Sequence, residues 1–239
     1  MARLPISEVF TSIQGEGSLT GVPSFFIRLS GCNLRCAWCD TPYASWKPDG
    51  QPREIAEIVR LAASSGVSHA VVTGGEPMIF EPLGELCDSL KAAGLHITIE
   101  TAGTVFRDIA CDLMSISPKL ANSTPTIGDS RDPTGAWRER HEATRLNLPV
   151  LQNLLDQYPN RQFKFVVCSG DGLDRDVAEI DMVLSQLLGL ERHQVMLMPE
   201  GVSLPDPESA ARIAEICVRR GWRYCGRLHI QLYGNRRGT

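Results

Sequence analysis

Apolar side chains recur along the chain with two different periods, and the two kinds of segment alternate. Between most of the strand-like runs, apolar residues are spaced as on one face of a helix. Regular alternation of strand and helix is typical of a parallel sheet with helical crossovers, so the pattern predicts an α/β fold. The predicted strands are residues 24–29, 69–73, 96–100, 112–117, 162–167, 194–198 and 227–233.

Three helical segments also carry signals for their ends. Pro52 stands at the predicted start of a helix over residues 52–64. Asp174 is the predicted N-cap of a later helix. Asp206 is the predicted N-cap of the last helix, and Gly221 follows its predicted final turn.

Two regions depart from the alternation. The first 23 residues predict an added strand and a glycine-rich turn. Residues 121–141 are polar, rich in Pro and Gly, and too long for an ordinary connection, so we expect a surface insertion that could act as a lid. Length alone allows one large domain or two, and we interpret residues 1–239 as a single domain.

Composition narrows the possible partners. The chain is 43% hydrophobic and 22% charged, which excludes a disordered protein. Its net charge is 24 − 28 = −4, and no long run of Lys or Arg predicts a nucleic-acid surface. No apolar run approaches the roughly 20 residues that a membrane span requires, and the first ten residues lack the hydrophobic segment of a secretory signal. We therefore expect no membrane partner and a cytoplasmic location.

Three of the eight cysteines, Cys32, Cys36 and Cys39, fall within eight positions. In a chain without a secretory signal such a cluster is more typical of a metal or catalytic site than of disulfides. Structural zinc requires four ligands, whereas a [4Fe-4S] cluster held by three thiolates keeps one iron open to a ligand that is not protein. The cysteines alone favour an iron–sulfur cluster, with zinc and no metal left as alternatives.

Small or polar residues follow several predicted strands. The carboxyl ends of parallel strands lie at one edge of a sheet, so loops that follow them can contact one bound cofactor. Each loop taken alone could be only a turn. These loops are the cysteine stretch, residues 74–77, residues 101–103, the segment from Ser117 to Lys119, and the residues after Met198.

The spacing Cys-x3-Cys-x2-Cys with Trp38 before the last cysteine, followed after the next strand by "GGEP", resembles the radical S-adenosylmethionine (SAM) enzymes. The resemblance implies a [4Fe-4S] cluster on Cys32, Cys36 and Cys39 that cleaves SAM to a 5′-deoxyadenosyl radical. It also implies a partial or modified (β/α)6-type barrel, here with an extra N-terminal strand or hairpin. By the same resemblance the SAM-binding residues are Gly74, Gly75 and Glu76 for the methionine amino group, Ser117 and Lys119 for the carboxylate or ribose, and Trp38 and Met198 for adenine.

Longer stretches are similar to the 7-carboxy-7-deazaguanine synthases over most of the chain: "SIQGEGSLTGVPSFFIRLSGCNLRCAWCDTPYA", "TGGEP", "IETAGT", "ISPKL" and "RLHIQLYGN". The resemblance implies ring contraction of 6-carboxy-5,6,7,8-tetrahydropterin with loss of ammonia, on the route to queuosine and other 7-deazapurines. It further implies Mg²⁺, a homodimer, and an electron donor such as flavodoxin or ferredoxin. No catalytic residue is expected beyond the cofactor radical.

Several residues fit a pterin substrate. Arg28 lies in an apolar strand, where an unpaired guanidinium is costly, so we expect a carboxylate partner, and the resemblance places it on the substrate. Gln14 and Glu16, on a glycine-flanked turn, offer an amide and a carboxylate to the pterin edge. The resemblance adds Thr101, Gly103 and His229 as further substrate contacts.

Asp40 and Thr41 are hard oxygen donors directly after the last cysteine. Mg²⁺ prefers such donors and keeps several waters. By resemblance Thr41 is the direct ligand and Asp40 supports it.

Two other functions share part of this pattern. A radical SAM activating enzyme that acts on a protein glycine has the same cysteine triad, but "QGEG" and "ETAGT" argue against it. A non-enzymatic iron–sulfur electron carrier, or a zinc module, leaves "GGEP", Ser117 and Lys119 unexplained. Some members of the family finish soon after the last strand, whereas here "YGNRRGT" follows, so how the far edge of the pterin is held stays open. The 121–141 segment has no match in the resemblance.

Overall fold

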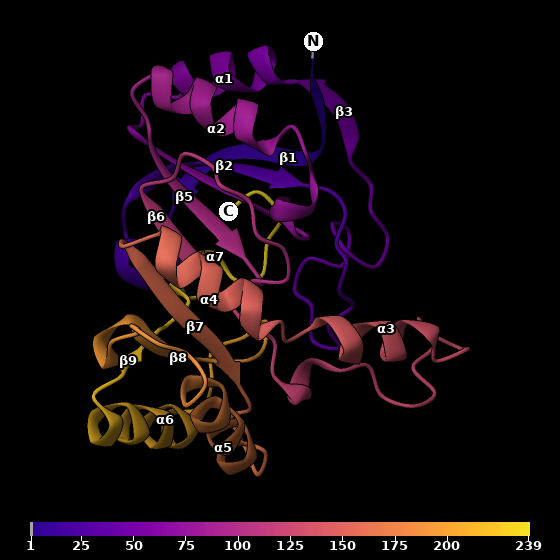
Figure 1. The fold of residues 1–239 in the computed structure, drawn as a ribbon, viewed down its shortest axis with the longest axis vertical. Coiled ribbons are helices and arrows are strands. Elements are labelled where there is room, and N and C mark those ends of the chain that lie inside the picture. Colours follow the sequence, from indigo (N-terminus) through magenta and orange to yellow (C-terminus); the bar gives the residue numbers. More distant parts are fainter. Residues whose placement is uncertain (1) are drawn as a thin grey trace.

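The computed structural model describes residues 2–239 and contains one nine-stranded sheet in the order β3-β1-β2-β4-β5-β6-β7-β8-β9. β1 is antiparallel to β2 and β3, and the remaining neighbours pair in parallel (Figure 1). The strands are β1 (Arg3–Ile13), β2 (Pro23–Leu29), β3 (Gln51–Glu54), β4 (His69–Gly74), β5 (His96–Thr101), β6 (Leu113–Ile116), β7 (Arg161–Val167), β8 (Val195–Pro199) and β9 (Arg223–Tyr224).

The sheet is open, because β3 and β9 form its two edges and do not pair with each other. The predicted partial α/β barrel with an added N-terminal strand is confirmed. The helices are α1 (Ile55–Ala63), α2 (Leu83–Ala92), α3 (Ala136–Thr144), α4 (Leu148–Gln157), α5 (Leu173–Leu184), α6 (Pro207–Arg220) and α7 (Leu228–Tyr233). Apolar faces of α1, α2, α4, α5 and α6 pack on the sheet in one continuous core, as the ribbon view indicates (Figure 1).

Six of the seven predicted strands are confirmed, and the seventh is wrong. Residues 227–233 form the short helix α7. The apolar alternation there does not serve a sheet, since Ile230 is buried but Leu232 is 55% exposed. The sheet edge is occupied instead by β9, which pairs with β8.

The helix signals were right for α6 and wrong for two others. Asp206 accepts a hydrogen bond from the Ser209 N–H at 2.9 Å, and Gly221 ends the helix at φ 68°. Pro52 instead lies in edge strand β3, where the missing N–H costs little. Asp174 lies within the first turn of α5, after the N-cap Gly172, where a carboxylate still favours the helix dipole.

Residues 121–141 are exposed in the middle and buried at both ends. Ile127 is 89% exposed, whereas Ser123 and His141 are fully buried. In Figure 1 the segment leaves the sheet and returns through α3 at one side of the molecule. Its ends are therefore part of the packed structure and not an appended loop.

Candidate active site

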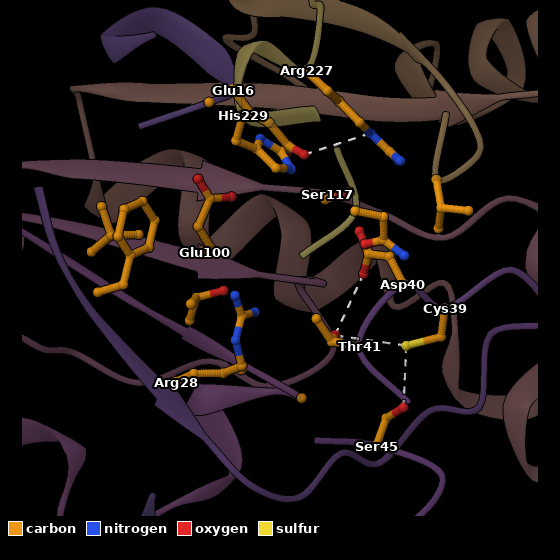
Figure 2. A pocket seen from close by; sticks show the side chains of 18 of the residues that line it. Glu16, Arg28, Cys39, Asp40, Thr41, Ser45, Glu100, Ser117, Arg227 and His229 are labelled. Atoms are coloured by element: carbon orange, nitrogen blue, oxygen red, sulfur yellow. Dashed lines mark hydrogen bonds and ion pairs between the residues drawn. The ribbon is translucent and has the colours of Figure 1, made fainter. Parts of the chain in front are cut away.

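A cavity of about 620 Å³ opens at the carboxyl ends of the parallel strands. Sixteen of the predicted site residues line it, and Glu76 and Gly103 do not. Figure 2 shows the cysteine loop on one side of this space and Glu16, Glu100 and His229 on the other. The lining residues from the sequence analysis are Gln14, Glu16, Arg28, Cys32, Cys36, Trp38, Cys39, Asp40, Thr41, Gly74, Gly75, Thr101, Ser117, Lys119, Met198 and His229.

The three cysteines come from the loop after β2. Cys36 is buried, and Cys32 and Cys39 are partly buried. Burial raises the pKa of Cys36, and it raises the pKa of Cys32 to about 12, so a bound metal is required to hold them as thiolates at neutral pH. Within residues 2–239, no three His, Cys, Asp or Glu side chains converge as the ligands of one ion would. Thiolates on different irons of a cluster need no such convergence.

The ends of the 121–141 segment hold this loop in place. The Ala37 N–H donates to the Ser123 carbonyl at 2.7 Å, and the Arg35 N–H donates to Nδ1 of His141 at 3.1 Å. The other ring nitrogen of His141 lies 2.9 Å from the Ser123 hydroxyl. Two backbone donors that flank Cys36 are thereby fixed by a segment about a hundred residues away.

Gly74 and Gly75 bring backbone close to the cysteine loop. A Cβ on Gly74 would lie 2.1 Å from the Leu29 carbonyl oxygen, and one on Gly75 would lie 2.1 Å from the Gly31 carbonyl oxygen. Gly74 also has φ 139°, which favours glycine. Any larger residue would displace the cavity wall.

Glu76 is buried behind this wall and does not line the cavity, so its contact with the methionine amino group stays a prediction. Its carboxylate accepts hydrogen bonds from Thr101 Oγ1 at 2.8 Å, the Ala102 N–H at 2.7 Å and the Met78 N–H at 3.0 Å. Burial raises the pKa of this carboxyl group. Glu76 therefore ties the loops after β4 and β5 together.

Gly103 also lies off the cavity, and its substrate contact stays a prediction. Its φ is 71°, and an added Cβ would lie 2.4 Å from Leu151 Cδ2. Glycine is needed there for the turn and for packing on α4. Thr101 does line the cavity, although its hydroxyl already donates to Glu76.

The wall beyond the cysteines combines one cation with one apolar surface. Nζ of Lys119 donates to the Ser117 carbonyl at 2.6 Å and contacts its hydroxyl at 3.0 Å. Trp38 packs against a small buried cluster that includes Met198 and Val166. The arrangement offers a positive group and a flat apolar patch to one ligand.

The opposite wall carries buried charges. Lys164, on β7, pairs with Glu16 at 2.5 Å and with Glu100 at 3.1 Å. Burial alone raises the pKa of Glu16, but the charges of Lys164 and Arg227 outweigh it and lower the value to about 2. Glu16 is therefore ionised throughout the physiological range.

Arg28 has the expected carboxylate partner within the chain, and its contact with a substrate carboxylate stays a prediction. Its Nε donates to Glu8 at 2.6 Å, and the Tyr43 hydroxyl donates to the same carboxylate at 2.9 Å. The bond to Glu8 uses Nε, which leaves Nη1 and Nη2 able to bind a second carboxylate.

His229 lies on α7 and not on a strand, yet it reaches the cavity (Figure 2). It packs on the QGEG turn so closely that a Cβ on Gly15 would lie 1.9 Å from its Nδ1. Burial lowers its pKa, although Glu16 opposes this shift. A neutral imidazole can both donate and accept a hydrogen bond.

Asp40 and Thr41 lie side by side next to Cys39. The Thr41 hydroxyl is 3.4 Å from Asp40 Oδ1 and 3.8 Å from Cys39 Sγ (Figure 2). In Figure 2 Thr41 lies between Cys39 and Arg28. The donor set is the type that Mg²⁺ takes.

Residues 235–239 form the edge of the cavity that the sequence analysis did not assign. Arg237 pairs with Asp49 at 2.8 Å and with Glu8 at 3.2 Å. Its guanidinium also lies 4.1 Å from the ring centre of Tyr43. The C-terminus is thus pinned beside β1.

Sequence reasoning missed several lining or supporting charges. Glu100 and Lys164 interrupt apolar strands, and that interruption was the signal that could have found them. Glu8 lies directly opposite Arg28 in the β1–β2 pair. The missed residues are Glu8, Tyr43, Glu100, Lys164, Arg227 and the 235–239 tail.

Comparison with known proteins assigns the family. A sequence profile described as the Radical SAM superfamily matches residues 26–146. A 7-carboxy-7-deazaguanine synthase from Rhodopirellula baltica is 48% identical, with 100% of this chain and 90% of the relative covered. One from Halobacterium salinarum is 40% identical, with 97% and 91% covered. The chain belongs to the 7-carboxy-7-deazaguanine synthase family.

A solved structure agrees with this membership. QueE from Escherichia coli superposes with a TM-score of 0.71 at 27% identity, and the match covers 95% of each chain. The protein is therefore an enzyme of the radical SAM superfamily, which implies a [4Fe-4S] cluster and SAM. The residues fit both groups, since three thiols, a cation and an apolar wall share one cavity. No helix in residues 2–239 has the length and apolar character to cross a bilayer.

Proposed function

We propose that this enzyme contracts the ring of 6-carboxy-5,6,7,8-tetrahydropterin to 7-carboxy-7-deazaguanine with loss of ammonia, for queuosine and other 7-deazapurines. One observation supports the proposal most strongly: the cysteine triad shares its cavity with an arginine and a set of buried carboxylates. Such a wall fits a small molecule that carries a carboxylate at one side and N–H donors at the other.

Each wall of the cavity has a part in binding. The terminal nitrogens of Arg28 bind the substrate carboxylate. Gln14 donates and accepts hydrogen bonds along the pterin edge, and the ionised Glu16 accepts them. Neutral His229 and the Thr101 hydroxyl add polar contacts. The substrate is held with its reacting carbon toward the cysteine end.

The cofactor wall would hold SAM over the cluster. Cys32, Cys36 and Cys39 would ligate three irons. Lys119 and Ser117 would bind the carboxylate or ribose, and Trp38 and Met198 would pack on adenine. When bound, the cluster and SAM together supply a 5′-deoxyadenosyl radical that abstracts hydrogen.

Asp40 and Thr41 would hold Mg²⁺ between the two walls, with Thr41 as the direct ligand. The ion would supply positive charge to anchor the substrate carboxylate. We further propose a homodimer, a flavodoxin or ferredoxin as electron donor, and a cytoplasmic location.

One anaerobic assay tests the function. Reconstituted protein is mixed with dithionite, SAM, Mg²⁺ and 6-carboxy-5,6,7,8-tetrahydropterin, and the products are analysed by mass spectrometry. We expect a new species lighter than the substrate by one ammonia, with little net consumption of SAM. If 5′-deoxyadenosine accumulates without this species, the enzyme acts on another substrate, such as a protein glycine.

A further inference from the structure

Lys164 is the most deeply buried charge in the cavity wall. It lies in the middle of β7, and 3% of its surface is exposed. Its ammonium group bridges Oε2 of Glu16 at 2.5 Å and Oε2 of Glu100 at 3.1 Å. Burying this charge is costly unless it is paired, so its presence among apolar strand residues requires an explanation.

Charge neutralisation explains only part of the arrangement. One ammonium and two carboxylates sum to −1 at the bridge itself, and Arg227, 3.6 Å from Glu16, offsets this charge from the C-terminal segment. A single carboxylate would be enough to neutralise Lys164, yet two carboxylates from different parts of the chain pair with it. Both carboxylates line the cavity, with side chains 16–17% exposed. The bridge therefore presents an excess of acceptors to the cavity.

The second oxygen of each carboxylate has only a distant partner. Glu16 Oε1 lies 3.6 Å from Arg227 Nε, and Glu100 Oε1 lies 3.4 Å from Gln14 Nε2. Strong hydrogen bonds to carboxylates are about 2.7–2.9 Å long, so both oxygens can accept further donors. Both side chains are 16–17% exposed to the cavity, so these oxygens are open to donors on a ligand that fills it.

We propose that Lys164 is a positioning residue that holds Glu16 and Glu100 as a paired, ionised acceptor set, and that this set selects a ligand edge with several N–H donors. The aminopyrimidinone edge of a pterin has this chemistry. The identity of that edge rests on the proposed function; the role of Lys164 as a bridge rests on the contacts above.

Removing the ammonium should make binding depend on pH. Glu16 faces Lys164 on β7 and Arg227 and His229 at the C-terminal segment, while Glu100 on β5 faces Lys164. Without Lys164, burial raises the pKa of Glu16 above its value of about 2, although Arg227 and His229 still oppose the rise. A protonated Glu16 loses an acceptor, so binding should weaken as the pH falls.

The test measures anaerobic substrate binding to reconstituted, unreduced holoenzyme at pH 6.0 and 8.5. The variants are Lys164→Met, which removes the charge, and Lys164→Arg, which keeps it. Lys91→Met is the matched control, because Lys91 is half exposed on α2 and pairs only with Asp112. SAM cleavage by dithionite without substrate reports the cofactor wall, and thermal unfolding reports the fold.

For Lys164→Met we expect a Kd about 10-fold above wild type at pH 8.5 and about 100-fold above it at pH 6.0, as buried acceptors lose charge. SAM cleavage should stay within about 3-fold of wild type. In Lys164→Arg the substrate Kd should be nearly the same at both pH values, as in wild type. Lys91→Met should bind the substrate with the wild-type Kd. A Lys164→Met protein whose Kd stays within 3-fold of wild type at both pH values would overturn the proposal.

A second arm does not depend on folding of the variant. Wild-type enzyme is offered an analogue of the substrate that lacks the exocyclic amino group. A site built for N–H donors should bind it at least 30-fold more weakly, since buried acceptors are left unpaired. Equal binding of both compounds overturns the acceptor role. If wild type binds and converts neither compound, the proposed substrate itself is wrong. This outcome differs from failure of the Lys164 proposal, in which wild type binds the substrate and the variants do not differ from it.

Discussion

Two cysteines, Cys36 and Cys87, illustrate how location decides the role of a buried thiol. Both are buried, and burial raises the pKa of both thiols. Cys36 lies on a cavity wall with two other thiols, whereas Cys87 packs among apolar side chains of the core. Only the first environment provides metal partners and open space for a ligand.

This difference predicts the effect of two alanine substitutions. Cys36→Ala should abolish cluster assembly and activity, because a cubane with two protein ligands is not held. Cys87→Ala should keep the iron and lose about 1 kcal/mol of stability, as expected for a small deletion in a packed core. Iron content and the visible charge-transfer absorption distinguish them. A full four-iron complement in Cys36→Ala would refute the assigned ligand set.

Arg28 shows how one residue can serve the fold and the ligand together. Glu8 takes its Nε, so the guanidinium is oriented before any ligand arrives. Such prior orientation lowers the entropy cost of binding a carboxylate. The side chain is only 16% exposed, which strengthens the interaction.

We expect Arg28→Gln to raise the substrate KM about 100-fold, because a lost charge-assisted pair costs about 3 kcal/mol. Cleavage of SAM without substrate should be retained. Arg3→Gln is the control, since Arg3 is 61% exposed in a surface pair with Glu54. Steady-state kinetics decide: a fall in kcat at constant KM would show that Arg28 does not bind substrate.

At the scale of elements, the cluster-binding loop has no secondary structure of its own between residues 30 and 50, so other elements must hold it. The 121–141 segment does so through Ser123 and His141. Both residues are fully buried, and burial lowers the pKa of His141 to about 4, so its ring is neutral at physiological pH. A neutral ring keeps Nδ1 as the acceptor for the Arg35 N–H.

His141→Ala should therefore lower the unfolding free energy by about 2 kcal/mol and speed iron loss to a chelator, because two buried groups lose their partner. His141→Asn, whose Oδ1 can replace Nδ1, should recover part of both effects. His193→Ala, at a residue 71% exposed, should match wild type. If the His141→Ala protein is destabilised but loses iron at the wild-type rate, the 121–141 segment does not hold the cluster-binding loop.

The elements also show what sequence patterns can and cannot predict. Strands β4 to β8 could be predicted from apolar runs, because a strand that is buried on both faces is apolar along its length. Residues 227–233 alternate apolar and polar side chains as a strand would, but they form α7. The place beside β8 in the sheet is already taken by β9. Pro52 carried a helix-start signal yet joined β3, because β1 offered an edge to pair with. Motif spacing found the cysteine wall, whereas the Glu8–Arg28 pair depends on the register of β1 and β2, and the Glu16–Lys164 pair joins residues 148 positions apart in the sequence.

At the scale of the molecule, segments from the N-terminal and C-terminal parts of the chain both line the cavity. β1 and its QGEG turn come from the N-terminus, and α7 with the 235–239 tail comes from the C-terminus (Figure 1). Arg237 joins them through Glu8 and Asp49, and its side chain is 46% exposed. Exposed ion pairs contribute at most about 1 kcal/mol each, so the tail can be held over substrate and still open.

Deletion of residues 235–239 should leave the fold intact and impair closure. We expect Tm to change by less than about 3 °C, because few buried contacts are lost. KM should rise about 10-fold, and SAM cleavage without product should increase as water gains access to the cavity. Arg237→Met should reproduce part of this effect, and high salt should mimic it in wild type by screening the ion pairs. Arg212→Met, which breaks an exposed pair with Asp174 on α5, serves as the control. An unchanged KM with a large fall in Tm would show instead that the tail supports the fold and does not close the cavity.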